Sequence, residues 1–184
     1  IISTQPKHYS RYALREFTWN SITQKNRNPL LGRDASIDGV KTGHTRSAGY
    51  CLIGSSERDD LRLIGTVMGA ENNRERGDAV YSLLRFGFAA YERHKLYQPG
   101  TEIIQSVVYK GKNATISLGI NDAVDITLPK GSGKGLTAVV KMNDPIIAPF
   151  PKGEQLGKLT VKLNGSFLQS RSLVALESVE AGSW

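Results

Sequence analysis

From residue 96 onwards, the sequence alternates short segments rich in β-branched and apolar residues with turn signals spaced about ten residues apart. The dipeptide Asn164-Gly165 separates the last two segments, and it favours a type I′ hairpin turn because glycine and asparagine tolerate positive φ. The pattern therefore predicts a small all-β sandwich over residues 96–184. The expected strands cover residues 103–109, 114–118, 124–128, 136–141, 158–163 and 166–168.

Residues 1–95 have a mixed pattern, which predicts an α+β layer. Apolar-rich segments predict strands at 37–42, 49–55 and 61–68, and Glu75 to His94 has the apolar spacing of an amphipathic helix. Residues 1–35 are expected to be loop-rich, with a short helix from Tyr12 to Trp19. Antiparallel strands need more helix cover than this segment supplies, so the layer is expected to be incomplete.

Composition excludes several classes of protein. The net charge of +7 is spread along the 184 residues without a basic cluster, so we expect no nucleic-acid partner. No apolar run is long enough for a transmembrane helix, which needs about 20 residues. Cys51 is the only cysteine and is expected to be buried and inert. One cysteine and three scattered histidines give no metal-ligand spacing, so we expect no metal and no cofactor.

The segment from Asp38 to Thr45 contains Lys41-Thr42-Gly43 directly after a hydrophobic residue. On a strand at the edge of a cleft, the ammonium and the hydroxyl suit a substrate carboxylate, and glycine allows another backbone to approach closely. This triplet is one of three motifs of active-serine penicillin-binding enzymes. The other two, Ser-x-x-Lys and Ser-x-Asn, do not occur in the sequence.

Several motifs in order resemble the D-alanyl-D-alanine carboxypeptidases, which are low-molecular-mass penicillin-binding proteins of the bacterial cell envelope. The resemblance covers nearly the whole chain. It implies a partial transpeptidase-like or β-lactamase-like catalytic domain at residues 1–95 and a β-sandwich domain at 96–184. The motifs are Asn26-Arg27-Asn28, Asp38 to Thr45, Ala48-Gly49-Tyr50, Leu63 to Gly69 and Arg74-Glu75-Arg76.

The resemblance also implies roles for particular residues. Lys41 would supply positive charge and assist proton transfer at the serine, and the backbone N–H of His44 would be one oxyanion-hole donor. Thr42 and Arg76 would bind the substrate carboxylate, for which a bidentate guanidinium is well suited. The strand edge at Gly43 would pair with the substrate peptide. Arg27 would border the substrate-binding site.

The expected activity is removal of the terminal D-alanine from peptidoglycan stem peptides through a serine acyl-enzyme, with β-lactams as inhibitors. Its location would be the periplasm, or the outer face of the bacterial cytoplasmic membrane. Because two motifs are absent, we expect the nucleophile to lie in a missing N-terminal half, and this chain alone to be inactive. We also expect the membrane-anchoring C-terminal helix of the family to be absent.

Other activities remain open at this point. A DD-endopeptidase of the same superfamily would carry the same motifs. A class A β-lactamase would share the Lys-Thr-Gly strand, although it would not carry a trailing β-domain of about 90 residues. The fragment is alternatively a non-catalytic binding or spacer module, in which the β-domain holds the catalytic domain away from the membrane.

Overall fold

The computed structural model describes residues 1–183. The chain separates into two compact units, of which the first comprises Ile1–Glu92 and the second begins at Arg93. The first unit combines helices with antiparallel strands, and the second is built from strands and one short 3-10 helix. The predicted α+β architecture with a trailing all-β sandwich is therefore confirmed.

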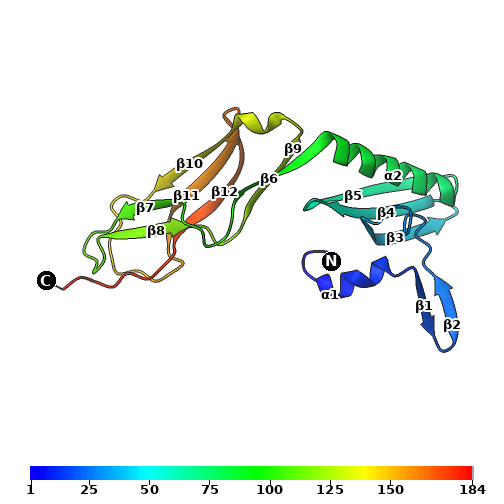
Figure 1. The fold of residues 1–184 in the computed structure, drawn as a ribbon, viewed down its shortest axis with the longest axis horizontal. Helices are drawn as coiled ribbons and strands as arrows, with labels where there is room; N and C mark the ends of the chain where they lie inside the picture. Colours follow the sequence, from blue (N-terminus) through cyan, green and yellow to red (C-terminus); the bar gives the residue numbers. More distant parts are fainter. Residues whose placement is uncertain (184) are drawn as a thin grey trace. The chain divides into compact units, whose positions relative to one another are not determined.

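The first unit is organised around a three-stranded antiparallel sheet with the order β3-β4-β5. Figure 1 shows helix α2 lying along one face of this sheet. These elements follow the predicted pattern closely, with each strand slightly longer than expected. Their bounds are β3 Ile37–Thr45, β4 Gly49–Arg58, β5 Leu61–Ala70 and α2 Asn73–Ala90.

Helix α2 is fixed at its start by side-chain caps and along its length by an apolar stripe. Asn72 is the N-cap, and its side chain accepts a hydrogen bond from the Glu75 N–H at 2.9 Å. Val80 and Leu84, four residues apart, are buried on the face toward the sheet. They form a core with residues of the sheet and of the segment that precedes it, namely Leu30, Ile37 and Leu52.

The prediction for the segment before β3 was wrong in one element. The short helix expected from Tyr12 to Trp19 is absent, because Glu16–Trp19 forms strand β1, which pairs with β2, Ile22–Lys25. Asn20 and Ser21 form the two-residue turn, and both have positive φ, which suits a hairpin. Helical structure precedes this hairpin instead, as α1 (Pro6–Tyr9) and the 3-10 helix η1 (Ser10–Ala13).

The amphipathic helix ends earlier than its predicted limit at His94. Helix α2 stops at Ala90, and Tyr91 already has an extended backbone. The following residues, Tyr91–Tyr97, form strand β6, which pairs with β9, Val124–Pro129. Leu96 and Tyr97 pack against a core cluster of the second unit, so long-range packing overrides the local helical pattern there.

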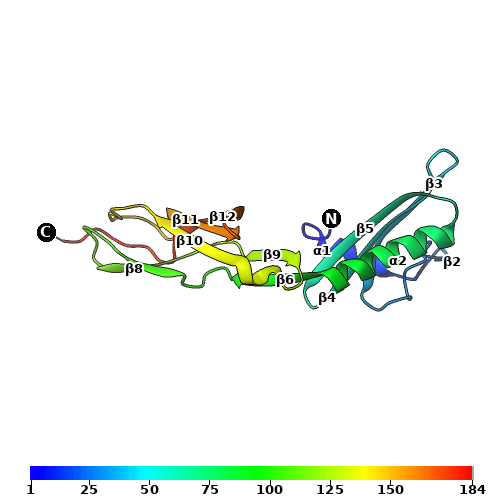
Figure 2. The ribbon, with the colours of Figure 1, turned by 90° about the horizontal axis from the view of Figure 1, so that it is seen from above.

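The second unit contains a five-stranded sheet with the order β10-β11-β12-β8-β7, in addition to the β6-β9 pair. Figure 2 shows that the sheet curls, so that β8 lies in a different layer from β10, β11 and β12. The predicted Asn164-Gly165 hairpin is confirmed, with positive φ at both residues. The bounds are β7 Ile104–Val107, β8 Thr115–Gly119, β10 Leu136–Met142, β11 Gln155–Leu163 and β12 Ser166–Ala175; η2, Ser132–Gly135, is the 3-10 helix.

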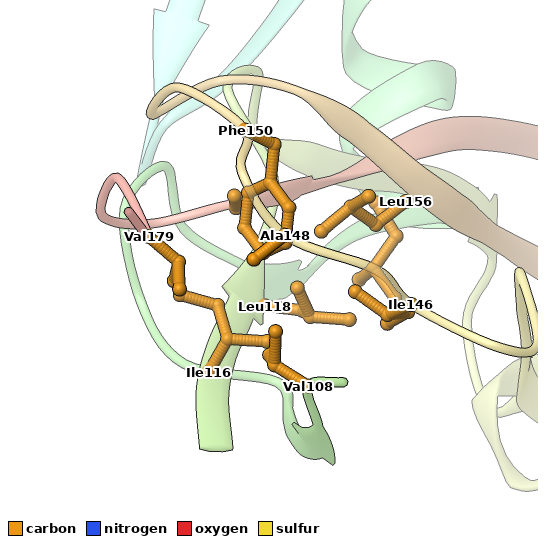
Figure 3. Close-up of a cluster of buried hydrophobic side chains, with 10 residues drawn as sticks. Val108, Ile116, Leu118, Ile146, Ala148, Phe150, Leu156 and Val179 are labelled. Atoms are coloured by element: carbon orange, nitrogen blue, oxygen red, sulfur yellow. The ribbon is translucent and has the colours of Figure 1, made fainter. Parts of the chain in front are cut away.

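Two apolar clusters stabilise the second unit. In one, Leu159 and Val161 of β11 pack against Val124 and Ile126 of β9, which joins the two sheets. In the other, side chains of β8 meet those of the loop between β10 and β11 (Figure 3). That loop supplies Ile146, Ala148 and Phe150 to the cluster, whose side chains point toward Ile116 and Leu118 in the close-up.

A polar cluster fixes the turn that leads into β3. Asp34 accepts hydrogen bonds from the backbone N–H and the hydroxyl of Ser36, at 2.9 and 2.7 Å, and forms an ion pair with Arg58. The Ser36 hydroxyl also lies 2.6 Å from the hydroxyl of Ser56. These hydrogen bonds, the backbone one above all, lower the pKa of the Asp34 carboxyl below its usual value.

The lowered pKa predicts a pH-dependent contribution of Asp34 to stability. The contribution is complete above the usual aspartate pKa, and it is lost as the pH falls from about 4 through the lower pKa of the folded state. We expect Asp34→Asn to reduce the free energy of unfolding by about 1 kcal/mol at pH 7. The difference from the wild type should shrink below pH 4. Urea denaturation at several pH values measures it, and parallel stability curves from pH 7 to pH 3 would contradict the assignment.

Candidate active site

The candidate site is built on β3, which is an outer strand of its sheet and pairs only with β4 among the described residues. Thr42 pairs with Leu52, whose side chain is buried in the core under α2. Residues directly opposite in an antiparallel pair share a face, so Thr42 points toward the α2 side. Side chains alternate along a strand, so Lys41 and Gly43 belong to the opposite face.

Arg76 of α2 contacts the same residues of β3 from the helix side of the sheet. Its side chain is buried, and Nη1 donates to the carbonyl oxygens of Gly43 and Cys51 at 2.9 and 3.0 Å. The guanidinium is held in turn by Asn73, whose Oδ1 accepts from Nε at 2.9 Å and from Nη2 at 2.6 Å. Four hydrogen bonds and burial fix this cation in one orientation.

The hydrogen bonds from Arg76 to Gly43 and Cys51 show which backbone groups of β3 point away from β4, toward the unpaired edge of the sheet. Gly43 and Cys51 face each other across β3 and β4, and one nitrogen reaches both carbonyl oxygens, so both carbonyls point into the space between the strands. Successive carbonyls on a strand point in opposite directions. The carbonyl of Thr42 and the N–H of His44 therefore point to the free side of β3.

The ammonium of Lys41 also lies at this free edge. Lys41 is exposed, and its Nζ donates to the carbonyl oxygen of Thr42 at 2.7 Å. The edge thus combines a cation, a carbonyl and an N–H group within a few residues. A carboxylate or a developing oxyanion would be attracted by the cation and the N–H, and an extended peptide would find backbone partners.

An aromatic stack fixes the end of β3. The rings of His44 and Tyr50, which are paired across the strands, lie with their centroids 4.1 Å apart. The guanidinium carbon of Arg76 lies 5.3 Å from the centroid of the Tyr50 ring, within the range of a cation–π contact. Arg76 is thereby linked to both the backbone before His44 and the ring beside it.

The start of β3 is anchored by a second polar group. Asp38 accepts a hydrogen bond from the Tyr9 hydroxyl at 2.8 Å and forms an ion pair with Arg62 at 2.7 Å. Arg62 also donates to Ser55 at 2.7 Å. Burial is the main cause of the raised pKa of Tyr9. Asp38 thus ties the strand to the helical segment at the N-terminus.

The other predicted residues have diverse surroundings. Arg27 is exposed in the segment between β2 and β3, and its substrate role stays a prediction. Cys51 is half-buried rather than buried, because its thiol lies near the surface and donates to the carbonyl of Ala48 at 3.5 Å. The role of Arg76 at the substrate carboxylate also stays a prediction. Asn73 and Tyr50, which hold Arg76, were not identified from sequence, because their contacts depend on the meeting of α2 with β3 and β4.

Other possible sites lie elsewhere or are absent from the described part of the chain. A hollow of about 940 Å³ is lined by residues between Arg11 and Asn26, including Phe17, Trp19 and Ile22, and by none of β3. Across residues 1–183, no group of three or more acidic, histidine or cysteine side chains is arranged to hold a metal ion. None of the helices there is long and apolar enough to cross a membrane.

This architecture is that of solved penicillin-binding proteins. Penicillin-binding protein 5 from Haemophilus influenzae superposes with a TM-score of 0.85, at 36% identity, over 98% of this chain and 53% of that one. A peptidoglycan synthesis regulatory factor, PBP3, from Streptococcus pneumoniae gives a TM-score of 0.75 over 97% of this chain and 54% of that one; at 22% identity it supports the fold alone.

Sequence comparisons agree with the structural ones. Residues 1–72 match the D-alanyl-D-alanine carboxypeptidase family, and residues 91–181 match the C-terminal domain of penicillin-binding protein 5. The carboxypeptidase DacC of Escherichia coli is 36% identical over 100% of this chain and 46% of its own length. DacF of Bacillus subtilis is 36% identical over 91% of this chain and 43% of its own length.

The chain belongs to the D-alanyl-D-alanine carboxypeptidases, the low-molecular-mass penicillin-binding proteins. The family predicted from the ordered motifs is therefore confirmed. The chain spans about half the length of the curated relatives that it matches, with 46% of DacC covered.

Proposed function

We propose that this chain forms the Lys-Thr-Gly side of a D-Ala-D-Ala carboxypeptidase active site, whose serine lies on a segment outside these residues. The observation that carries the proposal is the free edge of β3, where the Lys41 ammonium lies beside outward-pointing backbone groups of Thr42 and His44. The names of the relatives, all D-alanyl-D-alanine carboxypeptidases, support the reaction.

In the proposed reaction, the serine oxygen attacks the carbonyl carbon of the penultimate D-alanine. The His44 N–H donates to the oxyanion of the tetrahedral intermediate, and the positive charge of Lys41 stabilises negative charge at the serine and at the substrate. The C–N bond then breaks, and the serine proton passes to the nitrogen of the departing D-alanine. Water next attacks the acyl-enzyme carbonyl and releases the shortened peptide.

The stem peptide would lie along the free edge of β3 as an added strand. The outward Thr42 carbonyl and His44 N–H provide main-chain partners, and Gly43 carries no side chain to obstruct the approach. We propose Thr42 Oγ, Arg76 and Arg27 as the groups that recognise the terminal carboxylate. Of these, Arg76 has its guanidinium committed to Asn73 and two carbonyls, so its contribution would be that of a buried positive charge.

The second unit bears on the alternatives. Its match to a penicillin-binding protein C-terminal domain favours a carboxypeptidase over a class A β-lactamase. A DD-endopeptidase would use the same edge, and assays on cross-linked and uncross-linked stem peptides would separate the two activities. A binding or spacer role of the second unit is compatible with catalysis by the first. Because the substrate is peptidoglycan, we place the enzyme in the periplasm or at the outer face of the cytoplasmic membrane.

Labelling with a fluorescent penicillin tests the proposal. The samples are the 20.1 kDa chain alone and a chimera in which it replaces the matching part of E. coli DacC. We expect label on the chimera, abolished by excess unlabelled penicillin, and release of D-alanine from a stem peptide. The chain alone should stay unlabelled. Label on the isolated chain would overturn the assignment of the nucleophile, and a folded but unlabelled chimera would overturn the proposed function.

A further inference from the structure

One peptide unit links the buried Arg76 to the proposed oxyanion donor. The carbonyl of Gly43 accepts a hydrogen bond from Arg76 Nη1 at 2.9 Å, and the N–H of the same peptide belongs to His44. This peptide is trans, and a planar trans peptide directs its C=O and N–H in opposite directions. The Arg76 guanidinium, which binds the carbonyl on the side toward β4, therefore sets the direction of the His44 N–H on the opposite side, at the free edge of β3.

The guanidinium is itself unable to turn freely. Arg76 is only 5% exposed, and Asn73 Oδ1 accepts from two of its nitrogens while Nη1 spans the carbonyls of Gly43 and Cys51. Hydrogen bonds from a charged donor are shorter and stronger than neutral ones. A charged donor at the carbonyl also polarises the peptide, which makes its N–H a better donor.

Tyr50 holds the other side of His44. Its ring contacts the imidazole, with centroids 4.1 Å apart and planes tilted by 39°, and it also contacts the guanidinium of Arg76, whose carbon lies 5.3 Å from the ring centroid. Rotation of the His44 backbone would move the imidazole off this ring. The stack and the hydrogen bond at Gly43 thus restrain the same short segment from two directions.

We propose that Asn73, Arg76 and Tyr50 are positioning residues that aim and polarise the His44 N–H for oxyanion stabilisation. The inference rests on the proposed function, since it presumes that this N–H faces the reacting carbonyl. Arg76 acts through the Gly43–His44 peptide, Asn73 acts through Arg76, and Tyr50 acts through the His44 ring. If these residues only braced β3 against β4, their replacement would change stability alone. If they position the donor, their replacement also changes the chemical shift of the His44 amide proton and the catalytic rate.

The amide itself is the first readout. In ¹H–¹⁵N spectra of the chain, we expect Asn73→Ala and Arg76→Met to move the His44 amide proton upfield, while amides of the second unit stay in place. Arg74→Met is the matched control, because Arg74 is on the same turn of α2 but its side chain is 92% exposed and pairs with Asp78. An unchanged His44 amide in both variants would overturn the inference.

The catalytic rate is the second readout, measured in the DacC chimera. We expect Asn73→Ala to lower kcat for D-alanine release by about 10-fold to 100-fold, with KM within about twofold. The reason is that a misdirected N–H weakens the hydrogen bond to the oxyanion, which forms in the transition state and not in the bound substrate. Tyr50→Leu should show the same split, and Tyr50→Phe should restore the rate, because the ring alone makes the stack. Arg74→Met should match the wild type.

The two proposals fail in different ways. If Arg76→Met does not fold, Asn73→Ala decides the question, since Asn73 is exposed and its loss leaves the core intact. Equal kcat values for the wild type and Asn73→Ala in an active chimera would overturn the positioning role and leave the proposed function standing. An inactive wild-type chimera would instead contradict the proposed function, and the amide shift alone would then decide whether Arg76 orients His44.

Discussion

Replacement of Lys41 by methionine in the DacC chimera is expected to lower the rate of acylation by fluorescent penicillin by about 10²-fold to 10³-fold. Methionine keeps an unbranched side chain only one atom shorter than lysine, but the free edge of β3 loses the cation that lies beside the Thr42 carbonyl. Charge that develops in the transition state is then no longer compensated there. The measurement is the initial rate of labelling at several penicillin concentrations.

A lysine of the second unit provides the control for this experiment. Lys141 is an exposed residue of β10, and Lys141→Met makes the same chemical change away from the Lys-Thr-Gly strand. It should label at the wild-type rate. If Lys41→Met labelled as fast as Lys141→Met, the assignment of Lys41 to the active site would have to be abandoned.

Replacement of Gly54 by alanine is expected to lower the free energy of unfolding of the first unit by about 1–3 kcal/mol. A Cβ at this position would lie 2.5 Å from Val80 Cγ1 and 2.9 Å from Leu30 Cδ1. Both residues are fully buried in the core between α2 and the sheet, so neither side chain can move away at low cost. Urea denaturation followed by circular dichroism measures the loss.

Gly43 on the neighbouring strand is the matched control, because its Cβ would meet nothing closer than Cys51 Cβ at 3.8 Å. Gly43→Ala should therefore leave stability within about 0.5 kcal/mol of the wild type, as expected for a surface change. We expect it to lower activity nonetheless, because the new methyl group would stand where the stem peptide approaches. Equal stability losses at Gly43 and Gly54 would show that the core does not set the cost.

Much of the fold follows from local pattern. Alternating apolar segments and Asn164-Gly165 were sufficient to predict most strands of the second unit, because period and turn chemistry agree there. The hairpin of β1 and β2 was missed, since Asn20-Ser21 lacks the glycine that usually marks such a turn. The end of α2 was misjudged, because the pairing of β6 with β9, which replaces the last helical turn, depends on residues far along the chain.

The candidate site likewise has residues that could be predicted from the sequence and residues that could not. Lys41, Thr42 and Gly43 were identifiable because their adjacency on one strand is itself the signal. The environment of Arg76 was not, since its hydrogen bonds join it to carbonyls 33 and 25 residues away in sequence. Backbone carbonyls have no sequence signature, so an arginine that binds them cannot be distinguished by pattern from one that binds a ligand.

The N-terminal cap of α2 bears on how long Arg76 stays bound to the Gly43–His44 peptide. Asn72 caps the helix and Asn73, the next residue, holds Arg76. Helix ends open locally at far lower free energy than a whole domain unfolds. Each opening of this first turn would release the guanidinium and with it the restraint on the Gly43–His44 peptide. On the proposed positioning role, the fraction of time for which the His44 N–H is correctly oriented would be set by the local opening equilibrium of this single helical turn.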